Sequence, residues 1–62
     1  MQRRIEGILE KVTGWIYDVQ DRKFEKMEVE VLLDDGKKLR FWHPEDLRGY
    51  VGKRVCLDYD EN

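Results

Sequence analysis

Apolar and charged residues alternate between positions 27 and 31, and the alternation resumes between positions 38 and 41 after an Asp34-Asp35-Gly36 segment. A period of two residues is that of a β-strand with one buried face, and a glycine-containing turn between two such runs predicts a β-hairpin. The register of the hairpin decides which side chains reach the core and which face solvent. It therefore constrains both the fold and the surface of this chain.

Two registers compete for this hairpin. A two-residue turn at Asp35-Gly36 would place Lys38 opposite Leu33, among the buried apolar residues, which is costly. A three-residue loop with Gly36 in the left-handed conformation keeps the apolar residues on one face and forms a cross-strand ion pair on the other. We therefore predict the three-residue loop. The opposite pairs that it predicts are Val29–Phe41 and Val31–Leu39 on the inner face, and Glu28–Trp42, Glu30–Arg40 and Leu32–Lys38 on the outer face.

Residues 3–19 allow two interpretations. Their apolar residues fall at helical spacing, but Gly7 and Gly14 would each cost about 1 kcal/mol relative to alanine inside a helix, and most of the apolar residues are β-branched. No capping residue precedes the segment, and two arginines at its start would lie at the positive end of a helix dipole. We favour a long strand, or two strands meeting near residues 13–14, with glycines at the bends.

The rest of the chain predicts a turn and two further elements. Residues 18–23 form the turn into a strand over 24–33, and Pro44 ends the second hairpin strand because proline has no amide proton to donate. Residues 44–49 predict one helical turn, since proline begins the segment, acidic residues follow and glycine ends it. Residues 53–59 predict the last strand. Its expected inward residues are Val55, Leu57 and Tyr59, and its outward residues are Arg54, Cys56 and Asp58.

The length of 62 residues fits one domain spanning residues 1–62, in which folding buries only about 60% of the surface of the unfolded chain. Cys56 is the only cysteine and His43 the only histidine. These counts exclude a disulfide within the chain and a four-ligand zinc site built from Cys and His. We expect Cys56 to be a structural thiol, and we expect no metal and no cofactor.

The charges nearly cancel, with 12 Lys and Arg against 14 Asp and Glu, and they are spread evenly along the chain. A protein that coats nucleic acid through charge alone is expected to carry a basic excess. Alanine and serine are absent, and a polar surface made almost wholly of charged residues is typical of hyperthermophile proteins, which predicts a thermophilic source. No apolar run approaches the roughly 20 residues of a membrane span, and no signal-peptide core is present, so we expect a cytoplasmic protein.

Three features resemble the small five-stranded β-barrel superfolds, either SH3-like or OB-fold. They are the residue 5–17 strand, the Leu33-Asp34-Asp35-Gly36 turn and the closing Gly52-Lys53-Arg54-Val55 strand. The resemblance implies an all-β barrel with one short helical turn before the last strand. The SH3-like layout fits better, because there is room for only one strand after the helical turn. Both superfolds frequently bind nucleic acids or peptides, which is an analogy at the level of fold.

Trp42 is the sharpest candidate for a binding residue. In the predicted register it faces outward beside Arg40 and opposite Glu28, and an exposed tryptophan next to an arginine is typical of interface hot spots and of stacking sites. The alternative is that residues 44–50 fold over Trp42 and form a second small core.

Two further groups extend this candidate surface. Lys37, Lys38 and Arg40 form a basic strip with Trp42, joined by Arg54 if the last strand lies alongside; the alternative is a solvated face neutralised by nearby acids. Trp15 and Tyr17 could continue an aromatic platform, or they could fill the ends of a small barrel.

His43 lies close to Glu45 and Asp46 in the sequence, but a general base needs an oriented partner and a pocket, which a 62-residue barrel rarely encloses. We therefore expect a non-enzymatic interaction module that binds a protein partner or a second copy of itself through the outer hairpin face. The alternative is a barrel that binds single-stranded DNA or RNA through the basic and aromatic strip.

Overall fold

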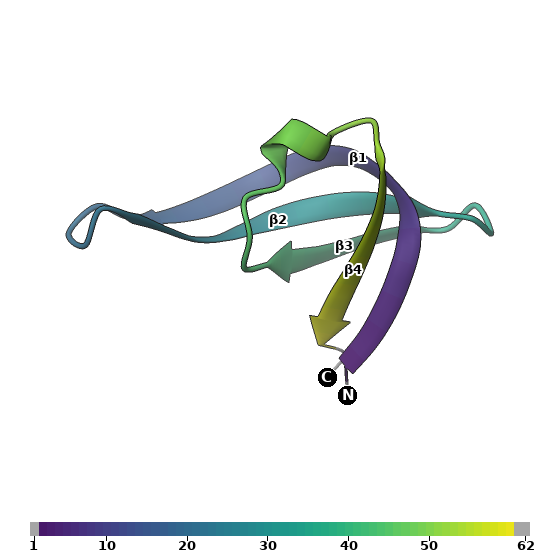
Figure 1. Ribbon diagram of the computed structural model, residues 1–62, viewed down its shortest axis with the longest axis horizontal. Helices are drawn as coiled ribbons and strands as arrows, with labels where there is room; N and C mark the ends of the chain where they lie inside the picture. The colour runs from purple at the N-terminus through teal and green to yellow at the C-terminus, as the bar shows by residue number, and fades with distance from the viewer. Residues whose placement is uncertain (1, 61–62) are drawn as a thin grey trace.

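The computed structural model describes residues 2–60, which form one antiparallel sheet (Figure 1). The order of its strands across the sheet is β3-β2-β1-β4. The protein is therefore all-β, as predicted. The elements are β1 (Gln2–Asp18), β2 (Lys23–Leu33), β3 (Lys38–His43), a single 3-10 turn η1 (Arg48–Tyr50) and β4 (Arg54–Asp60).

The segment that allowed two interpretations is one continuous strand, β1. Its first part, residues 2–8, pairs with β4, and residues 7–18 pair with β2. Gly7 lies where β1 has a neighbour on both sides, and a Cβ atom built there would lie 2.2 Å from the backbone oxygen of Leu32. Glycine is required at this position because the backbone of β2 approaches too closely for any side chain.

Three irregularities interrupt the ladder between β1 and β2. Glu10 and Thr13 are extra residues in β1, and Glu25 is an extra residue in β2. Extra residues of this kind bend a strand and increase its twist. They let β1 curve from β4 toward β2 without breaking, so the predicted division near residues 13–14 is a bulge instead of a chain reversal.

The hairpin between β2 and β3 has the predicted register at all five predicted pairs, from Glu28 opposite Trp42 to Leu32 opposite Lys38. The amide of Gly36 donates to the carbonyl of Leu33 at 3.0 Å, and the amide of Leu33 donates to the carbonyl of Lys37 at 2.8 Å. Gly36 has a φ of 89°. The three-residue loop with a left-handed glycine is therefore confirmed.

The core lies on one face of the sheet, which we call the inner face. The segment between β3 and β4 crosses this face (Figure 1), and Leu47 from this segment is buried with its amide donating to the Met27 sulfur at 3.3 Å. The inward and outward residues of β4 are as predicted. The buried apolar side chains are Leu9, Met27, Val29, Val31, Leu47 and Leu57.

Three details of the predicted barrel are wrong for the described residues. The sheet has four strands instead of five because β1 continues through its bulges, and it is not closed, since β3 and β4 are its two edges. The helical turn lies at Arg48–Tyr50 instead of residues 44–49. Residues 44–47 do not form a helical turn, because their backbone follows the path that places Leu47 in the core beside Met27.

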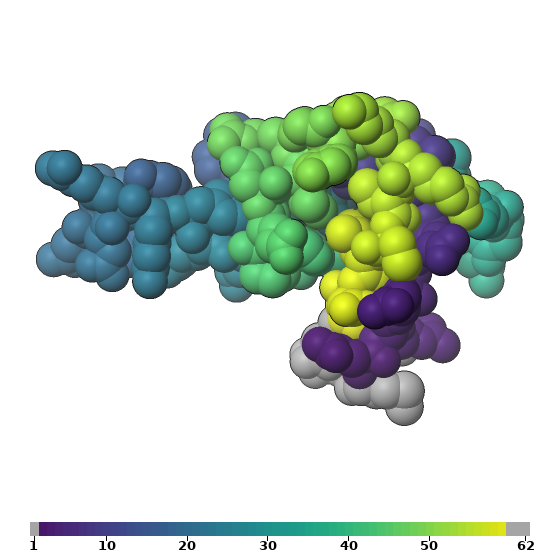
Figure 2. Space-filling view, viewed as in Figure 1, coloured from purple at the N-terminus to yellow at the C-terminus, as the bar shows by residue number. Residues whose placement is uncertain are grey.

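The β1 and β2 strands extend well beyond their neighbours (Figure 1). Pairing with β4 ends at Ile8, and pairing of β2 with β3 ends at Met27. The result is a projecting two-stranded segment, residues 10–26, which we call the ribbon; it accounts for much of the 41 Å length of the molecule (Figures 1 and 2). Among residues 2–60, no helix is long and apolar enough to cross a membrane.

Candidate interaction surface

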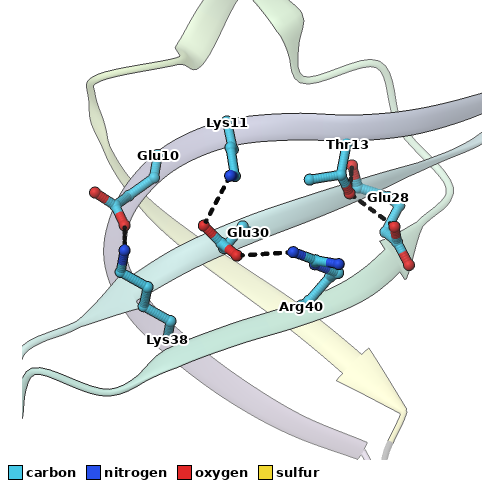
Figure 3. A network of polar contacts seen from close by, with 7 residues as sticks. All are labelled: Glu10, Lys11, Thr13, Glu28, Glu30, Lys38 and Arg40. Carbon is cyan, nitrogen blue, oxygen red and sulfur yellow. Dashed lines mark hydrogen bonds and ion pairs between the residues drawn. The ribbon is translucent and has the colours of Figure 1, made fainter.

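The outer face of the sheet, opposite the core, carries a network of charged side chains from β1, β2 and β3 (Figure 3). Glu30 lies at its centre, with Oε1 3.2 Å from Nη2 of Arg40 and Oε2 3.8 Å from Nζ of Lys11. Lys38 and Glu10 form a third ion pair at 3.2 Å. The predicted pair of Glu30 with Arg40 is therefore present.

Glu30 is only 9% exposed, although it was expected to face solvent. The side chains of Lys11 and Arg40 approach it from the two neighbouring strands (Figure 3). Long cationic side chains can cover a carboxylate with their aliphatic stems while the charged ends remain in water. The side chains of Lys11 and Arg40 thus shield the carboxylate of Glu30 from solvent.

The predicted basic strip is divided by these contacts. Lys38 and Arg40 are each ion-paired, and Arg54 lies on β4, at the opposite edge of the sheet from β3. The guanidinium of Arg54 donates to Asp34 at 3.0 and 2.8 Å and to Glu6 at 3.4 Å. These hydrogen bonds raise the pKa of Arg54 and lower the pKa of Asp34. Lys38, Arg40 and Arg54 therefore fit the alternative of a face neutralised by nearby acids better than they fit a basic strip. Lys37, the remaining residue of the predicted strip, lies exposed at the end of the turn.

Trp42 is 44% exposed on the outer face. Residues 44–50 do not fold over it, because they cross to the inner face, where Leu47 is buried. Nζ of Lys26 lies 5.4 Å from the centre of a Trp42 ring. A Cβ atom at Gly14 would lie 3.6 Å from Cη2 of Trp42, so the ring reaches across β2 to β1. Trp42 therefore lies against a glycine on one side and a lysine on the other.

Trp15 and Tyr17 are 61% and 52% exposed on the ribbon. Trp15 lies opposite Met27, which places it on a continuation of the inner face beyond the core. The alternative that these aromatics fill the ends of a barrel is therefore wrong. They are accompanied by Ile16 and Val19, both also exposed.

The sequence interpretation missed four residues of this surface. All four lie on the ribbon, which projects beyond the ends of β3 and β4. They are Gly14, Ile16, Val19 and Lys26. The available signal was the mismatch in strand length, since β1 has 17 residues and β2 has 11, whereas β4 and β3 have only seven and six. A sheet with such a mismatch must leave part of its longest strand unpaired on one side.

A hollow of about 420 Å³ lies between the end of β3 and β4, lined by Trp42, His43 and Cys56 among others. His43 is buried, and its Nδ1 accepts a hydrogen bond from the amide of Glu45 at 3.2 Å. This bond fixes the chain where it leaves β3. Over the part of the chain that the structure describes, no cluster of three or more His, Cys, Asp or Glu residues could hold a metal ion.

Comparisons of the chain with models of protein families, with curated proteins and with solved structures found no match.

Proposed function

We propose that this protein is a non-enzymatic interaction module that binds a protein surface, either that of a partner or that of a second copy. The observation that carries the proposal is the exposure of Trp15, Ile16, Tyr17 and Trp42 where the sheet narrows to the ribbon. Exposed apolar patches on small proteins mark interaction sites, and Trp and Tyr are enriched among the residues that dominate binding. Ile16 and Trp42 lie on the outer face of this region and Trp15 lies on the inner face, so both faces of the sheet expose apolar side chains here.

The charge of the surface supports a protein partner over nucleic acid. The net charge is −2, and three cations of the basic strip, Lys38, Arg40 and Arg54, form ion pairs with acids of the same chain. Binding of single strands uses cations that are available to phosphates in addition to aromatic stacking. The contact of Lys26 with the Trp42 ring is the feature that favours nucleic acid.

A photoreactive phenylalanine analogue placed at Trp42 or at Tyr17 tests the proposal in cells of the native host. Irradiation is expected to give covalent adducts with protein from both positions. The control is the same analogue at Asp35, an exposed residue in the hairpin turn at the other end of the sheet. Adducts with nucleic acid alone, or equal labelling from Asp35, would contradict the proposal.

Oligonucleotide binding is tested separately by fluorescence. Both tryptophans are exposed, so the titration uses Trp15→Phe and Trp42→Phe variants, each with one remaining reporter. We expect no quenching by a single-stranded oligonucleotide. Quenching of Trp42 that weakens steeply between two salt concentrations would favour the nucleic-acid alternative.

The resemblance to SH3-like barrels belongs to this proposal as an analogy. It is supported by the pairing of β1 with both β2 and β4, which curls the sheet, and by the contact between Phe41 and Tyr59 from its two edges. A cytoplasmic location and a thermophilic source stay predictions from composition.

A further inference from the structure

The ribbon has an unpaired backbone edge. The ladder between β1 and β4 ends at Ile8, and Leu9 makes the last contacts on that side, to Gly52 and Lys53. Within residues 2–60, no strand pairs with the edge of β1 that faces away from β2, from residue 10 to Asp18. Alternate residues along this nine-residue stretch of β1 therefore present backbone groups that a further strand could use.

Apart from the bulges at Glu10 and Thr13, this edge has little of the protection that exposed edges usually carry. Natural edge strands are short, bear several lysines or a proline, contain bulges, or are covered by another segment. Residues 10–18 contain one lysine, Lys11, and no proline, and they include the exposed Trp15, Ile16 and Tyr17. An isolated two-stranded ribbon is only marginally stable in water. Addition of a strand at this edge would stabilise the ribbon.

We propose that the occupant of this edge is a second copy of the chain, whose β1 pairs with the first β1 in antiparallel fashion about a two-fold axis at Trp15. The inference rests on the proposed function and names its partner. A two-fold axis perpendicular to an antiparallel ladder sets one residue opposite itself. The two four-stranded sheets then become one continuous sheet with the ribbons at its centre.

The faces of β1 decide the register. From their partners on β2, Lys11, Gly14 and Ile16 lie on the outer face, and Val12 and Trp15 lie on the inner face. With Trp15 on the axis and Thr13 left as a bulge, every pair joins residues of the same face. The pairs between the two copies are Trp15 with Trp15, Gly14 with Ile16, Val12 with Tyr17, and Lys11 with Asp18.

Charge complementarity favours this centre over its neighbours. A centre at Gly14 would place Lys11 opposite Ile16, and a centre at Ile16 would place Asp18 opposite Gly14. With Trp15 at the centre, each Lys11 faces Asp18 of the other copy, which makes two opposite-charge pairs by symmetry. Oδ1 of Asp18 accepts the amides of Gln20 and Asp21, which leaves Oδ2 for Lys11.

The pairing also accounts for the position of Trp42. Ile16 of the second copy would cover Gly14, beside which the ring of Trp42 lies; a Cβ atom built on Gly14 would be 3.6 Å from Cη2 of that ring. A large side chain placed over a glycine on the neighbouring strand compensates for the packing that the glycine lacks. One occupant therefore covers Trp15, Ile16 and Tyr17 and adds a neighbour for Trp42.

Sedimentation equilibrium over a range of concentrations is the first test. The mass is expected to rise from 7.6 kDa toward twice that value. Lys11→Asp and Asp18→Lys should each raise the dissociation constant by about tenfold, since each places two like-charged pairs at the interface. The double variant should return to within about threefold of the parent protein. Asp21→Lys, an equal charge change in the adjacent turn, is the matched control and should leave dimerisation unchanged.

Disulfide trapping tests the register directly. Opposite residues in an antiparallel ladder have Cα atoms about 4.5–5.5 Å apart, which a disulfide can span. In a Cys56→Ser background, Trp15→Cys is expected to give a covalent dimer on mild oxidation. Val19→Cys, on the same ribbon but far from the axis, is expected to give none.

Several outcomes would overturn the pairing. A protein that stays monomeric at all concentrations would do so, as would a dimer that is insensitive to both single charge reversals. Equal trapping at positions 15 and 19 would show non-specific association. If Trp15→Cys fails to fold, the charge reversals, which change only exposed or partly exposed residues, still decide the question. A monomer that gives adducts with another protein in the photocrosslinking experiment would refute the dimer and leave the proposed function standing.

Discussion

The rings of Phe41 and Tyr59 lie with their centroids 5.1 Å apart, although their strands, β3 and β4, are the two unpaired edges of the sheet. The contact brings together two segments that no backbone ladder joins. It lies at the side of the core where the curled sheet stays open. Side-chain packing therefore holds the two edges of this sheet together, as backbone hydrogen bonds do in a closed barrel.

Replacing either ring should show this coupling. Phe41→Leu and Tyr59→Leu are each expected to lower the free energy of unfolding, and a double-mutant cycle should give a coupling of about 1 kcal/mol, which is typical of aromatic pairs. Urea unfolding measures both quantities. Tyr50→Leu, on the exposed η1 turn, serves as the control and should change stability by less than about 0.5 kcal/mol. A coupling near zero would mean that the edges are held by other contacts.

Two glycines of β1 should respond oppositely to the same substitution. Gly7→Ala would bring a methyl group to 2.2 Å from the backbone oxygen of Leu32, so we expect a loss of about 3 kcal/mol or a failure to fold. Gly14→Ala meets only the end of the Trp42 ring at an ordinary contact distance, and its effect on monomer stability should lie within about 1 kcal/mol of zero. Thermal unfolding of both variants at low protein concentration makes the comparison. Similar losses at the two positions would contradict the close approach at Gly7.

The buried acid of the outer face should be coupled to its arginine. Glu30→Gln and Arg40→Met together form a cycle whose expected coupling is about 1 kcal/mol, because Glu30 is shielded from solvent. The exposed pair of Asp46 with Arg48 provides a matched cycle. That pair should give a smaller coupling, and molar salt should remove it more completely than the coupling at Glu30. Equal salt sensitivity of the two cycles would argue that Glu30 is open to solvent.

Stability should depend on pH through Asp34. Its hydrogen bonds from Arg54 hold the pKa of this carboxyl below its ordinary value of 3.8. A depressed pKa in the folded state contributes stability above the unfolded value and loses it as the pH falls through the folded value. Asp34→Asn should therefore lower Tm at neutral pH, and the difference from the parent protein should close as the pH falls below 3.8. In an Arg54→Gln background, Asp34→Asn should have little effect at any pH.

The hairpin was predictable because its pattern is local. Alternation on both sides of Gly36 left one register that buried Val31 and Leu39 without burying a lysine, and the structure has that register. The same reasoning gave the two faces of β4. In both cases the residues that make up the alternating pattern lie within a few positions of one another.

The rest depended on contacts between distant segments. The helical turn was misplaced because its capping signals are weaker than the burial of Leu47 against Met27, 20 residues earlier in the chain. The extra residues Glu10 and Thr13 each shift the two-residue alternation by one position, which made β1 resemble a helix or two strands. The ribbon, and with it the exposure of Trp15, follows from the lengths of the neighbouring strands and not from its own sequence.

The pairing of Gln2 with Asp60 at the far end of β1 gives this small protein a demanding folding order. The β2 and β3 hairpin can form from neighbouring residues, but seven of the 17 residue pairs of β1 are with the last strand of the chain. During synthesis, residues 2–6 must wait for β4 to leave the ribosome before they have a neighbouring strand. Folding should therefore be slow for a chain of this size, and the aromatic ribbon is the part of β1 that can find its partner first.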